Sequence, residues 1–176
     1  MSSTKVGVTI VETDRLVMRE IGKDDAAFIF ELLNTPSCIR YIGDRGVRVL
    51  DDARHYIETR YHQSYREHGY GLYAVELKPG QKPIGMCGFV RRNELPGPDI
   101  GFAFLPEYEG KGYGYESASA IMKYGRETLG FDRVFAITSI DNEKSGGLLI
   151  KLGFVLDKLI AMPDGEVLNL YLSSRG

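Results

Sequence analysis

The chain has 176 residues, of which 43% are hydrophobic and 26% charged, as is ordinary for one globular domain with a sizeable core. Its 22 basic and 24 acidic residues give a net charge of −2, which argues against a general nucleic-acid-binding protein, because such proteins usually carry a basic excess. The sequence shows no apolar run of the about 20 residues that a membrane helix needs, no signal-peptide pattern, and only two cysteines, without metal-binding spacing.

The first third of the chain is predicted to form one strand and two helices. Residues 15–20 follow a polar turn and are expected to form the strand. Apolar residues at helical spacing, preceded by two aspartates, predict a helix over 24–33. The segment 34–37, which contains a proline, is expected to end that helix. A second helix is expected over 51–68, before Gly69.

The middle of the chain is predicted to form three strands over 71–77, 83–92 and 99–105. Each is separated from the next by a short turn that contains proline and glycine. Strands connected in this way form an antiparallel meander.

The last third alternates strands and helices behind a glycine-rich turn, and glycine is frequent in the whole chain, at 21 of 176 residues. Its predicted elements are a helix over 115–129, a strand over 133–138, a helix over 142–152, and strands over 154–159 and 167–172. A meander followed by this alternation predicts an α+β fold of three layers, with helices on both faces of a mixed, mostly antiparallel central sheet. We expect a single soluble and cytoplasmic domain over 1–176, with its core at about 10–172.

The glycine-rich turn, EGKGYG at 109–114, lies between a predicted strand and a predicted helix. Such a turn directs backbone N–H groups and the positive end of the helix dipole at an anion, and its glycines let a phosphate approach the backbone. Lys111 adds a positive charge. The spacing fails for a Walker loop, and GxGxG is one residue short of the dinucleotide-binding pattern. A nucleotide-binding oxidoreductase with Asp132 on the ribose, and a tight turn without a ligand, stay as alternatives.

A second group of polar residues opens the predicted helix at 142–152. Asn142 and Ser145 are three residues apart, so that both side chains face the same way. The alternative is simple N-capping of the helix. Gly146 and Gly147 each cost about 1 kcal/mol relative to alanine inside a helix, which suggests that another group approaches this helix face closely.

Together and in this order, the two segments resemble the GNAT superfamily of acetyl-CoA-dependent N-acetyltransferases. The family's phosphate turn, Q/R-x-x-G-x-G/A, is similar to 109–114, and its N-x-x-S/A pattern before leucines and GF is similar to 142–154. The segments 13–20 (TDRLVMRE) and 100–118 (IGFAFLPEYEGKGYGYESA) resemble the branch that contains the ribosomal-protein N-terminal acetyltransferases. The resemblance covers about 10–172 and implies a GNAT-like fold.

Two residues depart from the family pattern. Glu109 stands where the motif has Gln or Arg, so that this side chain cannot help to hold a phosphate. Leu149 stands where many members have a tyrosine that acts as general acid. These departures favour an alternative, a non-catalytic acyl-CoA-binding regulatory module of the same fold.

The resemblance implies acetyl-CoA as cosubstrate, without a metal, and direct transfer of acetyl to a primary amine, either a protein N-terminus or a small amine. The residues that it implies for the cosubstrate lie on the third meander strand, in the glycine-rich turn and at the start of the later helix: Phe104, Leu105, Gly110, Lys111, Gly112, Tyr113, Gly114, Tyr115, Asn142 and Ser145. The partners are acetyl-CoA and the amine, with no nucleic acid or membrane, and the protein is expected to be a monomer or homodimer.

The resemblance also implies the catalytic residues. Asp99 is expected to act as the base, through water, although it also fits a turn residue after Pro98. Ser145 is expected to donate a hydrogen bond to the leaving thiolate. Glu107, Glu109, His55 and His68 are weaker alternatives for the base.

For the acceptor, Tyr41, Tyr56 and Tyr65 are expected to line the site, although aromatic residues on helices more often belong to a core. The net negative charge modestly favours a cationic acceptor.

Overall fold

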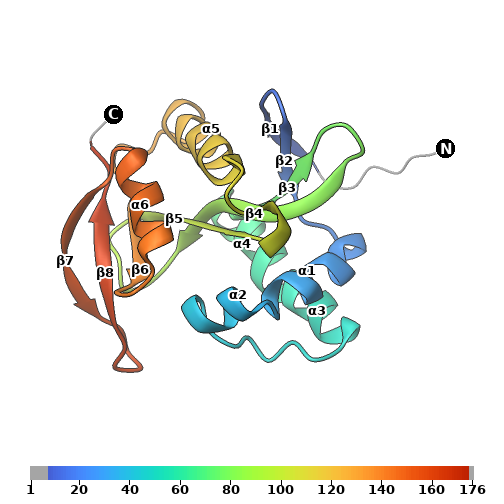
Figure 1. Cartoon of the computed structure of the whole chain (residues 1–176), viewed down its shortest axis with the longest axis horizontal. Helices are drawn as coiled ribbons and strands as arrows, with labels where there is room; N and C mark the ends of the chain where they lie inside the picture. The colour runs from blue at the N-terminus through green and yellow to red at the C-terminus, as the bar shows by residue number, and fades with distance from the viewer. Residues whose placement is uncertain (1–7, 175–176) are drawn as a thin grey trace.

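The computed structural model describes residues 8–174, which form one sheet of eight strands in the order β1-β2-β3-β4-β5-β6-β8-β7 (Figure 1). Only β5 and β6 run parallel, and every other neighbouring pair is antiparallel. The predicted mixed, mostly antiparallel sheet is therefore confirmed. The strands are β1 Thr9–Glu12, β2 Leu16–Glu20, β3 Leu72–Leu77, β4 Lys82–Arg91, β5 Pro98–Phe104, β6 Phe135–Ser139, β7 Val155–Ala161 and β8 Val167–Leu172.

Helices cover both faces of this sheet (Figure 1). One face carries η1, α1 to α3, η2 and α4, which together we call the helical layer, and the other carries α5 and α6. No helix within residues 8–174 is long and apolar enough to cross a membrane. The helices are η1 Lys23–Asp25, α1 Ala26–Leu33, α2 Pro36–Tyr41, α3 Leu50–Tyr56, η2 Ile57–His62, α4 Gln63–His68, η3 Pro106–Tyr108, α5 Tyr113–Glu127 and α6 Glu143–Lys151.

The helical predictions for the first third need one correction. Pro36 does not end the helical region but opens α2, because the first turn of a helix needs no N–H from its first residue. Thr35 caps this helix by accepting a hydrogen bond from the Cys38 amide at 3.3 Å. The helix expected over 51–68 is present as α3, η2 and α4 in succession, and η2 has π geometry.

The predicted meander is confirmed, but β1 was not predicted. β3, β4 and β5 pair antiparallel in succession, and Gly85 lies opposite Phe104. β1 extends the sheet beyond β2, although its residues carry only a weak strand pattern. β7 forms the opposite edge, where Leu156 and Leu159 are exposed.

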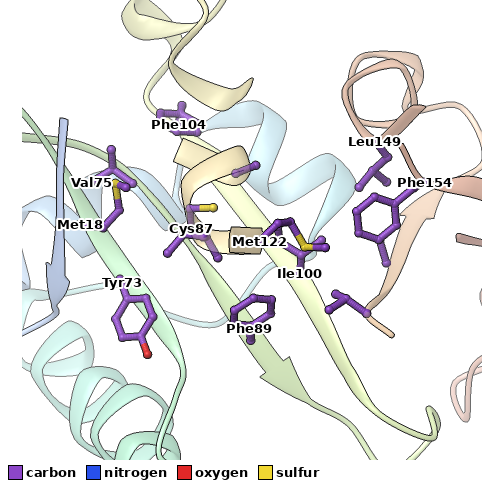
Figure 2. Packing of buried hydrophobic residues seen from close by; sticks show 14 of the residues in the cluster. Met18, Tyr73, Val75, Cys87, Phe89, Ile100, Phe104, Met122, Leu149 and Phe154 are labelled. Carbon is purple, nitrogen blue, oxygen red and sulfur yellow. The ribbon is translucent and has the colours of Figure 1, made fainter. Parts of the chain in front are cut away.

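Two cores lie on the two faces of the sheet. Figure 2 shows the one beneath α5 and α6, where Cys87, Phe89 and Ile100 lie close to Met122. Successive strand residues point to opposite faces, so Met86, the neighbour of Cys87, belongs to the other core with Leu105 and the helices α1 to η2.

A buried ion cluster fixes the helical layer to the sheet. The Arg19 guanidinium on β2 donates to both Asp25 oxygens, at 2.8 and 2.9 Å, and to Glu76 on β3 at 2.5 Å. Burial alone would lower the pKa of Arg19, but the hydrogen bonds to Asp25 and Glu76 raise it. Arg19 therefore stays charged, and the start of the helical layer is held against two strands.

Candidate active site

The ladder between β5 and β6 consists of a single register position, Asp99 opposite Phe135. Beyond it, the facing edges of the two strands are not paired with each other. A cavity of about 980 Å³ lies here and extends between the α6 N-terminus and the helices α2 to α4. Eight of the residues predicted for the site line it: Tyr41, Tyr56, Asp99, Phe104, Gly110, Gly114, Asn142 and Ser145.

Asp99 is a strand residue of β5 and not part of the turn before it. Its side chain is almost fully buried, and the Arg92 Nε donates to both carboxylate oxygens at 3.2 Å. Burial raises the pKa of Asp99 to about 6, and the Arg92 charge opposes this rise. Near pH 7 the carboxylate is therefore mostly ionised and has the proton affinity that a general base needs.

The β5 backbone presents unused groups to the cavity. The Leu105 amide donates to the Ile84 carbonyl at 2.9 Å, so it points toward β4. Directions alternate along a strand, so the backbone groups of Phe102 and Phe104 point toward β6. Of the two backbone positions predicted to bind the cosubstrate, Phe104 faces the cavity. Leu105 does not, and its side chain lies in the core beneath the helical layer.

The glycine-rich turn has the conformation that its sequence suggests. Gly110 and Gly112 have φ values of 74° and 88°, in the left-handed region that favours glycine. Gly112 is the N-cap of α5, and the first helical hydrogen bond runs from the Glu116 amide to the Gly112 carbonyl at 3.0 Å. The preceding amides, of 113–115, therefore have no helical acceptor. A Cβ on Gly114 would lie 3.2 Å from the Leu148 side chain.

Arg15 holds this turn in place, although no sequence motif indicates that role. Its Nε donates to Glu116 at 2.7 Å, its Nη1 donates to the Lys111 carbonyl at 3.3 Å, and its guanidinium lies 4.4 Å from the centre of the Tyr113 ring. A second cavity of about 610 Å³ lies beside it, lined by Arg15, Gly112, Tyr115, Lys123 and Lys151 among others. The Lys111 and Tyr113 side chains line neither cavity.

Asn142 is the N-cap of α6, which confirms the N-capping that the sequence offered as an alternative. Its Oδ1 accepts a hydrogen bond from the Ser145 amide at 3.2 Å. The Ser145 hydroxyl forms no hydrogen bond within the described residues and lines the cavity. A Cβ on Gly146 would lie 2.7 Å from the Tyr171 hydroxyl, which confirms the expected close approach. Gly147 has nothing within 4 Å of such an atom, so close packing does not explain it.

The three tyrosines that were expected to line the acceptor site do not all lie in the cavity. Tyr41 and Tyr56 line the cavity, but Tyr65 does not. The Tyr65 hydroxyl donates to the Leu72 carbonyl and accepts from the Ile21 amide at 3.0 Å. Its ring stacks on Tyr73 with the ring centres 5.7 Å apart. Tyr65 is thus a core residue, and a contact with an acceptor is not supported.

Among the alternatives for the base, Glu109 and His68 line the cavity, whereas Glu107 and His55 do not. Tyr61 lines it as well, although no sequence pattern distinguishes it from the neighbouring tyrosines. No group of three or more metal-binding side chains occurs in the part of the chain that the structure describes.

Comparisons with known proteins show the family to which this chain belongs. A family model described as Acetyltransferase (GNAT) domain matches residues 15–155. The Bacillus subtilis (strain 168) protein called Uncharacterized N-acetyltransferase YoaA is 32% identical over 146 residues, which is 82% of each chain.

Two solved structures show the same fold at lower identity. The microcin C7 self immunity acetyltransferase MccE, in complex with acetyl-CoA and AMP, has a TM-score of 0.79 at 17% identity and covers 97% of both chains. The ribosomal-protein-S5-alanine acetyltransferase from Vibrio fischeri has a TM-score of 0.76 at 19% identity, over 96% of this chain and 97% of the other. From the match of the family model and the identity to its relative, the chain belongs to the GNAT family of acetyltransferases.

Proposed function

We propose that this acetyltransferase transfers acetyl from acetyl-CoA to a primary amine by direct attack within the 980 Å³ cavity. The observation that carries the proposal is the position of Asp99. A buried carboxylate with a pKa of about 6 lies in the same cavity as the glycine-rich turn and the α6 N-terminus. A group that can accept a proton and a turn that can bind an anion therefore border the same cavity.

The turn fits the phosphates of acetyl-CoA. Free amides at the start of α5 and the positive end of its dipole favour an anion. Glycine at 110, 112 and 114 keeps Cβ atoms away from that surface. The Glu109 carboxylate lies 3.9 Å from Lys144, so its charge is partly balanced and need not repel the phosphates. The MccE complex supports this assignment, because a protein of the same fold binds acetyl-CoA.

The reaction forms a C–N bond and breaks the C–S bond, and the sulfur leaves as a thiolate. Asp99 takes the proton of the amine, through water, because only the neutral amine attacks. The Phe104 amide, which faces the cavity, is placed to stabilise the negative charge that develops on the carbonyl oxygen. Ser145 donates to the thiolate with its free hydroxyl. Leu149 is buried and apolar, so it supplies no proton.

The turn is tested by calorimetry of acetyl-CoA binding to the wild type and to the double variant Gly112→Asp, Gly114→Asp. The introduced carboxylates repel the phosphates, so we expect binding to be lost. Gly165→Asp is the control for an aspartate at a glycine with positive φ, because Gly165 has a φ of 91°, close to the 88° of Gly112, and lies in the turn between β7 and β8. Equal binding by wild type and double variant contradicts the proposed role of the turn.

Turnover is tested separately, by thiol release with a panel of amines. Thiol release that depends on the amine supports the transferase. Tight binding of acetyl-CoA without turnover of any amine favours the regulatory acyl-CoA-binding module, the alternative that Glu109 and Leu149 suggest.

A further inference from the structure

Two arginines without a carboxylate partner border the cavity on the side of the helical layer. Arg45 lies in the loop after α2, and Arg60 lies in η2. Neither forms an ion pair within the described residues. Other arginines on the same layer each pair with a carboxylate: Arg40 with Asp141 at 2.9 Å, Arg48 with Asp44 at 2.6 Å, Arg54 with Asp51 at 2.5 Å, and Arg66 with Glu58 at 3.8 Å.

Both arginines border one aromatic surface. The Arg60 guanidinium lies 5.4 Å from the centre of the Tyr56 ring. Tyr56 meets Tyr61 edge to face, with the ring centres 5.5 Å apart. Burial raises the pKa of the Tyr61 hydroxyl and of the Cys38 thiol, and the nearby charge of Arg45 opposes both rises. Arg45, Arg60, Tyr56 and Tyr61 all line the same cavity, so that both arginines lie on the side where these two rings are exposed to it.

The acids that line the cavity do not neutralise these arginines. Asp99 is held by Arg92, Asp141 by Arg40, and Glu109 faces Lys144. Glu67 accepts a hydrogen bond from Gln63 at 2.7 Å.

Two further charges line the cavity without an ion pair. Glu143 lies in the first turn of α6, where the helix dipole favours it. Arg91, at the end of β4, is a third arginine without an ion pair in the described chain. The lining of the cavity as a whole contains as many acidic as basic residues, but its part from the helical layer has two arginines, Arg45 and Arg60, against one acid, Glu67.

We infer that the acceptor is a primary amine that also carries an anionic group, either a carboxylate or a phosphate, which Arg60 and Arg45 bind while the amine faces Asp99. A guanidinium binds both anions through paired hydrogen bonds and is less strongly hydrated than an ammonium group. A polyamine would instead place its ammonium groups against these arginines. The net charge of the whole chain modestly favours a cationic acceptor, whereas Arg45 and Arg60 in the cavity favour an acceptor with an anionic group. We give the local charges more weight, because they lie where the acceptor would bind.

The inference rests on the proposed function, and pairs of amines that differ only in the anion test it. Tyrosine is compared with tyramine for a carboxylate, phosphoethanolamine with ethanolamine for a phosphate, and spermidine represents a cationic amine. We expect the anionic member of at least one pair to have the higher kcat/KM, by about ten- to a hundredfold, the usual effect of hydrogen bonds to a charged group. The pair that shows this preference identifies the anion.

Variants locate the effect. Arg60→Gln and Arg45→Gln should lower kcat/KM for the amine that carries the anion far more than for its partner that lacks the anion, and so remove the preference. Arg54→Gln is the matched control, because Arg54 lies on α3, pairs with Asp51 and does not line the cavity. Equal kcat/KM within both pairs, a preference for spermidine, or a preference that survives both substitutions overturns the inference while the transferase function stands.

If no amine is acetylated, binding measurements can still test whether the arginines bind the anion of an amine. If acetyl-CoA binds and no amine reacts, calorimetry of the same amines on the acetyl-CoA complex decides. Binding of the anionic amine that Arg60→Gln abolishes supports the inference without the proposed function. Equal binding of the two members of each pair overturns the inference, and the absence of turnover counts against the proposed function.

Discussion

The pKa of Asp99 results from two opposing influences, its burial and the charge of Arg92. Its burial in β5 favours the neutral acid, and Arg92 favours the carboxylate. The result is a pKa of about 6, above the ordinary 3.8 of aspartate and still below neutral pH. The Asp99 carboxylate is therefore mostly ionised at pH 7 and becomes protonated as the pH falls through about 6.

The pH dependence of kcat/KM tests this balance. The slope of log kcat/KM against pH should fall by one unit as the pH rises through about 6, where Asp99 loses its proton. Arg92→Met removes the opposing charge, so this break should move up by about one pH unit or more. Asp99→Asn should lack the break and lose about a hundredfold or more in kcat/KM. A break that stays in Asp99→Asn assigns it to another group.

Two adjacent glycines in α6 differ only in what surrounds them. Gly146→Ala places a methyl group 2.7 Å from the Tyr171 hydroxyl, so we expect a loss of about 1 kcal/mol or more in the free energy of unfolding. Gly147→Ala meets no atom within 4 Å and should gain up to about 1 kcal/mol from helix propensity. Urea unfolding measures both. Tyr171→Phe removes the hydroxyl and should reverse the loss in Gly146→Ala, and if it does not, the contact is not the cause.

At the scale of elements, the ion cluster of Arg19, Asp25 and Glu76 joins β2, β3 and the start of the helical layer. That layer also carries Tyr56 and Arg60, which line the side of the cavity that we propose for the acceptor. The cluster therefore connects the stability of the helices with the position of Tyr56 and Arg60.

Arg19→Met leaves two buried carboxylates without their partner, and we expect it to cost about 3–5 kcal/mol in the free energy of unfolding at pH 7. Arg54→Met removes an exposed ion pair and should cost less than about 1 kcal/mol. Equal costs for the two variants in urea unfolding at pH 7 would contradict the role of the cluster.

Sequence periodicity located the elements with strong patterns and missed those that depend on neighbours. The meander and α5 follow from alternation and from glycine, but β1 has a weak pattern and exists because β2 offers it an edge. Pro36 suggests a break in sequence, whereas the Thr35 cap turns it into the first residue of α2.

For the whole molecule, the motif residues that meet in the cavity were predictable because their spacing is local. Asn142 and Ser145 lie within one helical turn of each other, and the glycines lie within five positions. The partners that complete the site are distant in sequence. Arg15 contacts Glu116 across 101 positions, and no local pattern indicates that. The place of Tyr65 in the core depends likewise on Ile21 and Leu72, which only the fold brings together.

The single register position between β5 and β6 sets a limit on how stable this fold can become. A longer ladder between the two strands would satisfy more backbone groups and strengthen the sheet, but it would fill the space in which the Phe104 amide faces the cavity. Natural or engineered changes that raise the melting temperature by closing this gap should therefore cost activity. Thermostability should instead be sought at positions remote from the gap, such as the exposed strand β7.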